Sequence, residues 1–278
     1  VSQDLTAFLA QIETPFDAGG APLARNTGIL VEATANITAY YEVNRSNNPD
    51  IFALKGRNAL GTNFYLPLQN IWNHQTGLVP QGRSGFVVVA TEDNTVVTIT
   101  PTVALEGGRA AGVPYTVTLN RGQSYAGTVV DATGPGMPAG TRITANRVIA
   151  VTLFHDSIRT SSGGCHDLAG DQLVPVNIVG NEYVVVRGFL GFDSGGTYTT
   201  NPERISIIAT EANTTITVTN SAVNNYNIAS AGGLQMIALS NTDLRTSIIA
   251  DKPIYVFHYA GFGCETGGAL VPPIQCTG

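Results

Sequence analysis

The phrase ATEDNTVVTIT at residues 90–100 returns as ATEANTTITVT at residues 209–219, and seven of the eleven positions are identical. In both copies valine and isoleucine alternate with threonine, which is typical of a strand with one apolar face and one face covered by hydroxyl groups. Asn94 and Asn213 tolerate left-handed backbone dihedrals and suit tight turns. Each copy therefore predicts a strand, a tight turn and a second strand, joined as a hairpin.

Short β-branched runs between clusters of Gly, Asn, Pro and Asp fill most of the remaining chain, for example GFVVVATE, VIAVTLFH, RISIIATE and PIYVFHY. Signals for helices are nearly absent. Short strands at regular spacing, separated by turn residues, are typical of β-sandwiches and barrels. The sequence thus predicts an all-β fold.

A second phrase, in which Ile, Ala, Ile and Val follow one another at fixed spacing, occurs at residues 143–151 and again at residues 248–256. A looser third copy lies at residues 31–39. After each copy comes a polar loop and then a strand that contains proline, namely FYLP, QLVP or ALVP. Such recurrence indicates a duplicated building block rather than an active-site signature.

The repeats predict tandem, Ig-sized antiparallel β-sandwich units, of which the first is incomplete because no ATExNT phrase precedes residue 31. The expected division is an N-terminal arm and possible donor strand (1–25), a partial unit (26–60), two complete units (61–170 and 171–268) and the head strand of a following unit (269–278).

Charged residues make up only 12% of the chain, about half of the roughly 25% usual for soluble domains. The net charge of −6 argues against a nucleic-acid partner, since no group of basic residues is available to neutralise phosphates. No apolar run approaches the ~18 residues of a membrane span. A low-charge, threonine-rich surface is common in secreted or cell-surface β proteins, so we expect an extracellular location.

The three cysteines, Cys165, Cys264 and Cys276, cannot form a closed set of disulfides. Cys264 and Cys276 are close in sequence and flank a Gly- and Pro-rich turn region, which favours a local disulfide between them. Cys165 is then a free thiol, a partner for a cysteine of another chain, or a small buried apolar residue.

Three stretches, NPDIFALKGRNALGTNFYLPLQN, GCHDLAGDQLVPV and GFGCETGGALVPPIQCTG, resemble the N-terminal domain family of IgGFc-binding proteins, whose bacterial members occur in large adhesin-type surface proteins. The resemblance covers most of residues 26–278. It implies an extracellular, all-β module with an adhesive or structural role. No motif for contact with Fc maps onto this sequence, so Fc binding is not carried over.

Candidates for chemistry are confined to polar loops, such as CHD at residues 165–167 and CE at residues 264–265. Their spacing does not match a structural zinc site, so no metal or other cofactor is expected. The sequence has no nucleophile elbow and no phosphate-binding loop. We therefore expect a protein that is not an enzyme.

Three sequons mark Asn36, Asn44 and Asn213 as candidates for N-glycosylation. Ser157, within Asp-Ser-Ile, resembles a bacterial O-glycosylation site. Glycans are therefore candidate partners.

An incomplete sandwich has an open core and an unpaired edge, which another chain can complete. We expect a subunit of a surface filament, assembled head-to-tail from copies of itself. The residues expected to donate a strand are Leu5, Phe8, Leu9, Ile12, Leu270 and Val271. The alternative function is a surface adhesin module, cut from a longer tandem array, that binds a glycan or a protein.

Overall fold

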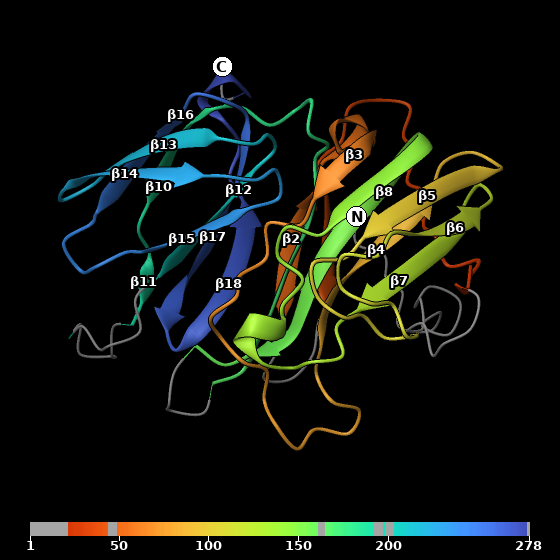
Figure 1. The fold of residues 1–278 in the computed structure, drawn as a ribbon, viewed down its shortest axis with the longest axis horizontal. Helices are drawn as coiled ribbons and strands as arrows, with labels where there is room; N and C mark the ends of the chain where they lie inside the picture. Colours follow the sequence, from red (N-terminus) through yellow and green to blue (C-terminus); the bar gives the residue numbers. More distant parts are fainter. Residues whose placement is uncertain (1–21, 44–48, 161–164, 192–196, 198–202, 277–278) are drawn as a thin grey trace.

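The computed structural model describes residues 22–43, 49–160, 165–191, 197 and 203–276. Strands dominate it, and the helical elements among the described residues are the short 3-10 turns η2 (Gly56–Ala59), η3 (Gly134–Gly136) and η4 (Ile274–Cys276). The strands form two halves that lie side by side in Figure 1. The expected antiparallel all-β fold is confirmed.

The first half is organised around the long strand β8 (Arg142–Ile158). The beginning of β8 pairs with β3 on one edge and β5 on the other, and its end pairs with β9 and β4. Two outer strands, β6 and β7, complete the sheet. The bounds are β3 (Gly61–Tyr65), β4 (Ser84–Ala90), β5 (Thr95–Thr100), β6 (Tyr115–Leu119), β7 (Ser124–Thr128) and β9 (Asp167–Gln172).

The second half repeats this pairing scheme, with β8 replaced by two strands, β16 (Arg245–Ala250) and β17 (Ile254–Gly263). β16 pairs with β10 and β13, and β17 pairs with β12 and β18. Pro253, which has no backbone N–H to donate, lies in the break between them. The other bounds are β10 (Glu182–Val186), β11 (Phe189–Leu190), β12 (Arg204–Ala209), β13 (Thr214–Thr219), β14 (Val223–Ile228), β15 (Leu234–Ala238) and β18 (Glu265–Leu270). We refer to β3–β9 as the first unit and β10–β18 as the second unit.

The repeated ATExNT phrase is a corner, not the hairpin that the sequence predicts. β4 and β5 do not pair with each other; both follow the same edge of β8, so that Val88 faces Val151 and Val97 faces Ala145. β12 and β13 follow β17 and β16 in the same way. The phrase lets the chain pass from one layer of the sandwich to the other.

Hydroxyl groups of the phrase fasten this corner identically in both units. Thr91 Oγ1 donates to Val148 O over 2.7 Å, and Thr210 Oγ1 donates to Pro253 O over 2.6 Å. Thr95 Oγ1 donates to Glu92 O over 2.7 Å, and Thr214 Oγ1 donates to Glu211 O over 2.8 Å. The residues shared by the two copies therefore make the same local hydrogen bonds, and the repeat does not indicate an active site.

We expect Asn94→Ala and Asn213→Ala each to lower the free energy of unfolding by about 1 kcal/mol, whereas Asn→Gly changes it little. Both asparagines have φ of 54°, a left-handed conformation that asparagine and glycine adopt readily and alanine does not. Denaturant unfolding of the two pairs of variants measures the difference. Equal stability of the alanine and glycine variants would contradict the assignment.

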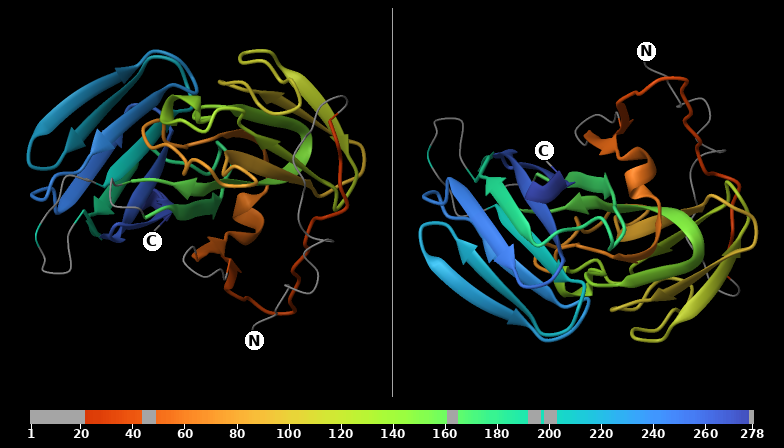
Figure 2. Two further views of the ribbon diagram at one scale, coloured as in Figure 1. Left: turned by 90° about the horizontal axis from the view of Figure 1, so that it is seen from below. Right: turned by 90° about the horizontal axis from the view of Figure 1, so that it is seen from above.

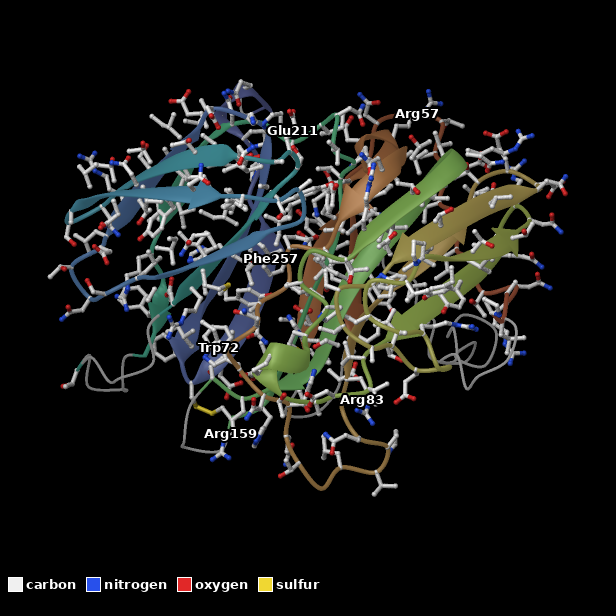
Figure 3. All side chains as sticks on the ribbon, viewed as in Figure 1. Arg57, Trp72, Arg83, Arg159, Glu211 and Phe257 are labelled. Carbon is white, nitrogen blue, oxygen red and sulfur yellow. A yellow bond between two sulfur atoms is a disulfide. The ribbon has the colours of Figure 1, made fainter. Side chains whose placement is uncertain are left out.

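Two apolar cores hold the molecule together, and the first extends across the junction between the units. It is formed by the interior of the first unit together with Tyr255, Phe257 and Tyr259 of β17. Trp72 packs edge-on against Tyr259, with ring centroids 5.5 Å apart. Figure 3 shows the labelled Trp72 and Phe257 at this junction. The second core lies wholly between the layers of the second unit.

Residues before β3 form no sandwich of their own in the described part of the chain. Arg25 exchanges two backbone hydrogen bonds with Ser124 at the edge of β7, and β1 (Ala39–Val43) pairs with β2 (Asp50–Leu54). The hairpin of β1 and β2 repeats the strand–loop–strand order of β8–β9 and β17–β18.

Candidate binding site

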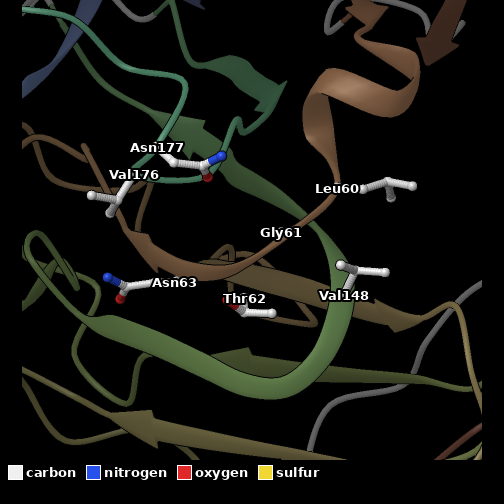
Figure 4. A pocket seen from close by; sticks show the side chains of 7 residues that line it. All are labelled: Leu60, Gly61, Thr62, Asn63, Val148, Val176 and Asn177. Atoms are coloured by element: carbon white, nitrogen blue, oxygen red, sulfur yellow. The ribbon is translucent and has the colours of Figure 1, made fainter.

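The first unit has a cleft of about 430 Å³ where β3 begins. Its walls come from three places: the start of β3, Val148 at the corner of β8, and the segment that follows β9. Figure 4 shows the lining side chains, which are Leu60, Thr62, Asn63, Val148, Val176 and Asn177 around Gly61. Val176 N donates to Asn63 O over 2.9 Å, which anchors the segment after β9 to the edge of β3.

The second unit has a cleft of about 380 Å³ at the corresponding place. It lies at the start of β10, beside the break between β16 and β17 and the segment after β18. Beside each cleft a glycine lies close to a proline. A β-carbon at Gly61 would lie 2.3 Å from Pro175 Cβ, and one at Gly180 would lie 2.5 Å from Pro273 Cβ. The two clefts are thus repeats of one feature.

The chemistry of the clefts suits polar, uncharged groups next to aliphatic ones. The first cleft offers the amides of Asn63 and Asn177 beside aliphatic side chains and carries no charged side chain. In the second, Lys252 Nζ donates to Ala212 O over 2.5 Å, and Asp251 Oδ1 accepts from Thr215 N over 2.8 Å. Both charges are already held by backbone groups. The amides are partly engaged as well, since Arg142 Nε donates to Asn63 Oδ1 over 3.1 Å and Gln275 Nε2 donates to Asn181 Oδ1 over 3.0 Å.

Sequence reasoning missed these clefts. Their lining residues are ordinary loop and strand-start residues, and no motif singles out Asn63, Asn177 or Gln275. The prolines in and after the repeated LVP strands were the available signal, because Pro175 of QLVP approaches Gly61 and Pro273, which follows ALVP, approaches Gly180.

The two units are joined by a disulfide between Cys165 and Cys264, whose Cα atoms are 5.7 Å apart. Figure 3 shows the bond in yellow near the labelled Arg159. This corrects the expected pairing of Cys264 with Cys276. Cys165 precedes β9 and Cys264 precedes β18, and hydrogen bonds tie these two strands together, so residues 99 positions apart meet.

Two carboxyl groups lie next to the disulfide. Asp167 is 5% exposed, and its Oδ2 accepts from Thr266 N over 3.0 Å. Burial, together with a hydrogen bond and repulsion from Glu265, raises the pKa of Asp167 to about 7. The Asp167 carboxyl group therefore keeps its proton below about pH 7.

Asp167→Asn is expected to raise the free energy of unfolding near pH 8 by about 1–2 kcal/mol and to leave it unchanged near pH 4. The folded pKa of about 7 lies above the usual value for an unfolded aspartate, about 3.9. Hence the stability that the protonated group contributes is present at low pH and is lost as the pH rises through 7. Denaturant unfolding at the two pH values gives the difference, with Glu211→Gln at an exposed carboxylate as control. An equal effect at both pH values would contradict a raised pKa.

A buried chain of hydrogen bonds crosses the junction of the units. His74 Nε2 and Ser84 Oγ are 2.7 Å apart, Ser84 Oγ and His155 Nδ1 are 2.5 Å apart, and His155 Nε2 lies 3.0 Å from Tyr259 Oη. Burial lowers the pKa of His74 to about 4 and that of His155 further below its usual value. The four side chains are at most 2% exposed and line neither cleft, so a substrate cannot reach Ser84.

One cluster among the described residues has the composition of a metal site: Cys165, Cys264 and Glu265. Both sulfur atoms are bonded to each other in the disulfide and are not thiolate ligands. The ring nitrogens of the buried His155 are already bonded to Ser84 and Tyr259. The arrangement does not fit a resident metal ion.

The glycosylation candidates fall in three different settings. Asn36 and Asn213 are exposed, and Asn213 lies at the corner of the second unit. Ser157 is 2% exposed, with its hydroxyl inside the protein, so it is withdrawn as a site for a glycan on the folded chain. Asn44 lies outside the described residues.

The strand-donor candidates at the C-terminal end are engaged in their own chain. Leu270 is 8% exposed and ends β18, which pairs with β17, while Val271 N donates to Val256 O over 2.9 Å. This corrects the expectation of a free head strand at residues 269–278. Leu5, Phe8, Leu9 and Ile12 lie outside the described residues.

Comparison with known proteins finds one family. A family model described as IgGFc binding protein matches residues 52–277, well over half of the chain. No curated protein sequence and no solved structure matches. Among the described residues, no helix has the length and apolar character to cross a membrane.

Proposed function

This chain belongs to the IgGFc binding protein family, and on that premise we propose that it is an extracellular module that binds a protein partner. The partner places an extended segment in the repeated clefts at the starts of β3 and β10. The observation that carries this proposal is the repetition of the cleft, with its glycine–proline contact, in both units.

An extended polypeptide fits the chemistry of the clefts better than a sugar or a nucleotide. Side-chain amides such as Asn63 and Asn177 pair with peptide N–H and C=O groups, and the neighbouring aliphatic side chains accept apolar residues. No aromatic ring lines either cleft to stack on a sugar or a base. The disulfide between the units is consistent with an oxidising, extracellular compartment.

The proposal is tested by selecting binders from a displayed library of random peptides and by measuring binding of purified IgG Fc, which the family description names. Asn177→Trp and Gln275→Trp fill one cleft each from an exposed position. We expect selected peptides to lose at least tenfold in affinity for one of these variants. The matched control, Asn227→Trp on the exposed face of β14, keeps full affinity.

Two results would reject the clefts as the binding site. One is that the library yields no peptide that binds the wild-type chain. The other is that selected peptides, or Fc, bind both filled variants as tightly as the wild type.

Self-association into a surface filament is a second candidate function, and the exposed apolar side chains among residues 29–41 and at Ile51 favour it. An incomplete sandwich with such a segment accepts a strand from another molecule. Electron microscopy of the purified protein should show regular filaments, and deletion of residues 1–21 should abolish them. A monodisperse monomer at high concentration would reject the filament.

Glycans at Asn36 and Asn213 are a further proposal, supported by the exposure of both sites. Glycosylation would add solubility to a surface with few charges. Intact-mass analysis of the native protein tests it, because a mass equal to that of the bare 29.1 kDa chain excludes modification.

A further inference from the structure

Residues 29–51 expose seven large apolar side chains, each 37–67% accessible: Ile29, Leu30, Val31, Ile37, Tyr40, Tyr41 and Ile51. Two of these positions, Val31 and Ile37, have interior counterparts in both complete units. Ile143 and Ile149, which match Val31 and Ile37 in the repeated phrase, are 0% exposed. Apolar residues at the same spacing are therefore buried in the complete units and exposed at residues 31 and 37.

The correspondence extends from the sequence to the packing. Gly28 and Gly140 stand three residues before Val31 and Ile143. A β-carbon at Gly28 would lie 2.6 Å from Gly122 O, and one at Gly140 would lie 2.0 Å from Gly232 O. Each segment thus packs against the same turn of the unit that follows it. Figure 2 shows the β1–β2 hairpin projecting away from the two sandwiches.

In each complete unit the ATExNT strand pair covers this phrase in one register. Ile143 faces Ile99, Ile149 faces Ala90 and Val151 faces Val88. The second unit repeats the register, with Ile248 facing Val218, Ile254 facing Ala209 and Val256 facing Ile207. Both ATExNT strand pairs of the chain are used in this way, and neither reaches residues 31–43.

We propose that residues 31–43 are the acceptor for a third ATExNT-type strand pair, carried by another β-sandwich unit of this family. The incoming strands run antiparallel to the acceptor, as β4 and β5 do along β8. The residue facing Val31 takes the place of Ile99, and the residue facing Ala39 takes the place of Val88. The acceptor carries only two charged residues, Glu32 and Glu42, so apolar burial dominates the contact.

The inference does not rest on self-association, because both ATExNT strand pairs of this chain already pair with β8, β16 and β17, and a folded second copy has none to donate. The probe is a synthetic peptide with the sequence of residues 84–100, which contains both strands of the first ATExNT pair. We expect it to bind the full chain and to lose at least tenfold in affinity for Ile37→Asp. The matched control is Ala35→Asp, because the counterpart of Ala35 is the exposed Arg147. This control should bind within twofold of the wild type.

The register is tested by disulfide trapping in a Cys276→Ser background. With Ala39→Cys in the chain, a peptide carrying cysteine in place of Val88 should form a cross-link. A peptide carrying cysteine in place of Val87 presents its thiol to the opposite face and should not.

Three results would overturn the inference: no binding of the peptide, equal binding to the two aspartate variants, or cross-linking without preference for register. Protection of residues 31–38, which precede β1, from hydrogen exchange in the peptide-free monomer would also overturn it, since the chain would already cover that part of its acceptor. If filaments form but the peptide does not bind, the proposed pairing at residues 31–43 is wrong, and self-association itself still stands. If the peptide binds and the protein stays a monomer, the proposed pairing is supported and self-association is rejected.

Discussion

Replacement of either Cys165 or Cys264 by serine is expected to lower the free energy of unfolding by about 4 kcal/mol. The bond closes a loop of 99 residues that includes most of the second unit. In the chain-entropy account, a cross-link of that span removes much of the freedom of the unfolded chain. For a chain of this size, the loss corresponds to a fall in melting temperature of roughly 10 °C.

Denaturant unfolding of the two variants, with and without reductant, measures the effect. Reductant should destabilise the wild type and leave the Cys165→Ser and Cys264→Ser variants unchanged. Cys276→Ser is the matched control, with stability equal to that of the wild type. The opposite pattern, in which Cys276→Ser is costly and Cys165→Ser is harmless, would restore the pairing of neighbours that the sequence favours.

The repeats were predictable from the sequence because they depend on local patterns. Alternation of apolar residues and threonines marks each strand, and the ATExNT phrase marks each corner. The left-handed asparagines at positions 94 and 213 follow from residue type and turn context. These features require only that a residue's neighbours in the chain be known.

The partners of each strand were not predictable in this way. ATEDNT reads as a hairpin because its two strands adjoin in sequence, yet both prefer the edge of β8, about fifty residues further on. The disulfide was misassigned for the same reason, since Cys276 is the nearer cysteine in sequence and Cys165 the nearer one in space. The burial of Ser157 likewise depends on the strand β8 that contains it.

The candidate site was the least predictable part. Each cleft is assembled from three segments that are distant in the chain, and its residues have no catalytic or ligand-binding signature. What the sequence did indicate is a third copy of the Ile-Ala-Ile-Val phrase, at residues 31–39. In the structure the phrase at residues 31–39 is correspondingly bare, with Val31 and Ile37 at least half exposed.

The second large effect is expected at Asp171, where Asp171→Ala should cost about 3–5 kcal/mol of unfolding free energy. This carboxylate is 3% exposed and joins the N-terminal region to both units. Its Oδ1 accepts from Lys55 Nζ and, over 2.8 Å, from Gln172 N, while its Oδ2 accepts from Leu270 N over 2.7 Å. Truncation leaves an ammonium group and two amides without their acceptor.

A double-mutant cycle with Lys55→Met separates the ion pair from the backbone bonds. Burial lowers the pKa of Lys55 and raises that of Asp171, and each charge opposes the shift of the other. Removal of one partner therefore leaves a charge that burial disfavours, and removal of both does not. We expect Lys55→Met combined with Asp171→Ala to cost clearly less than the sum of the single changes.

The hydrogen bonds from Leu270 N and Gln172 N to Asp171 make its removal costly apart from the ion pair with Lys55. Asp171→Asn keeps an oxygen for Leu270 N or Gln172 N but loses the charge that holds Lys55, so its cost should lie between those of the wild type and Asp171→Ala. Since Leu270 ends β18, the alanine variant should also increase hydrogen exchange at that amide. Additive costs in the cycle, together with unchanged exchange at Leu270, would show that the three regions hold together without this carboxylate.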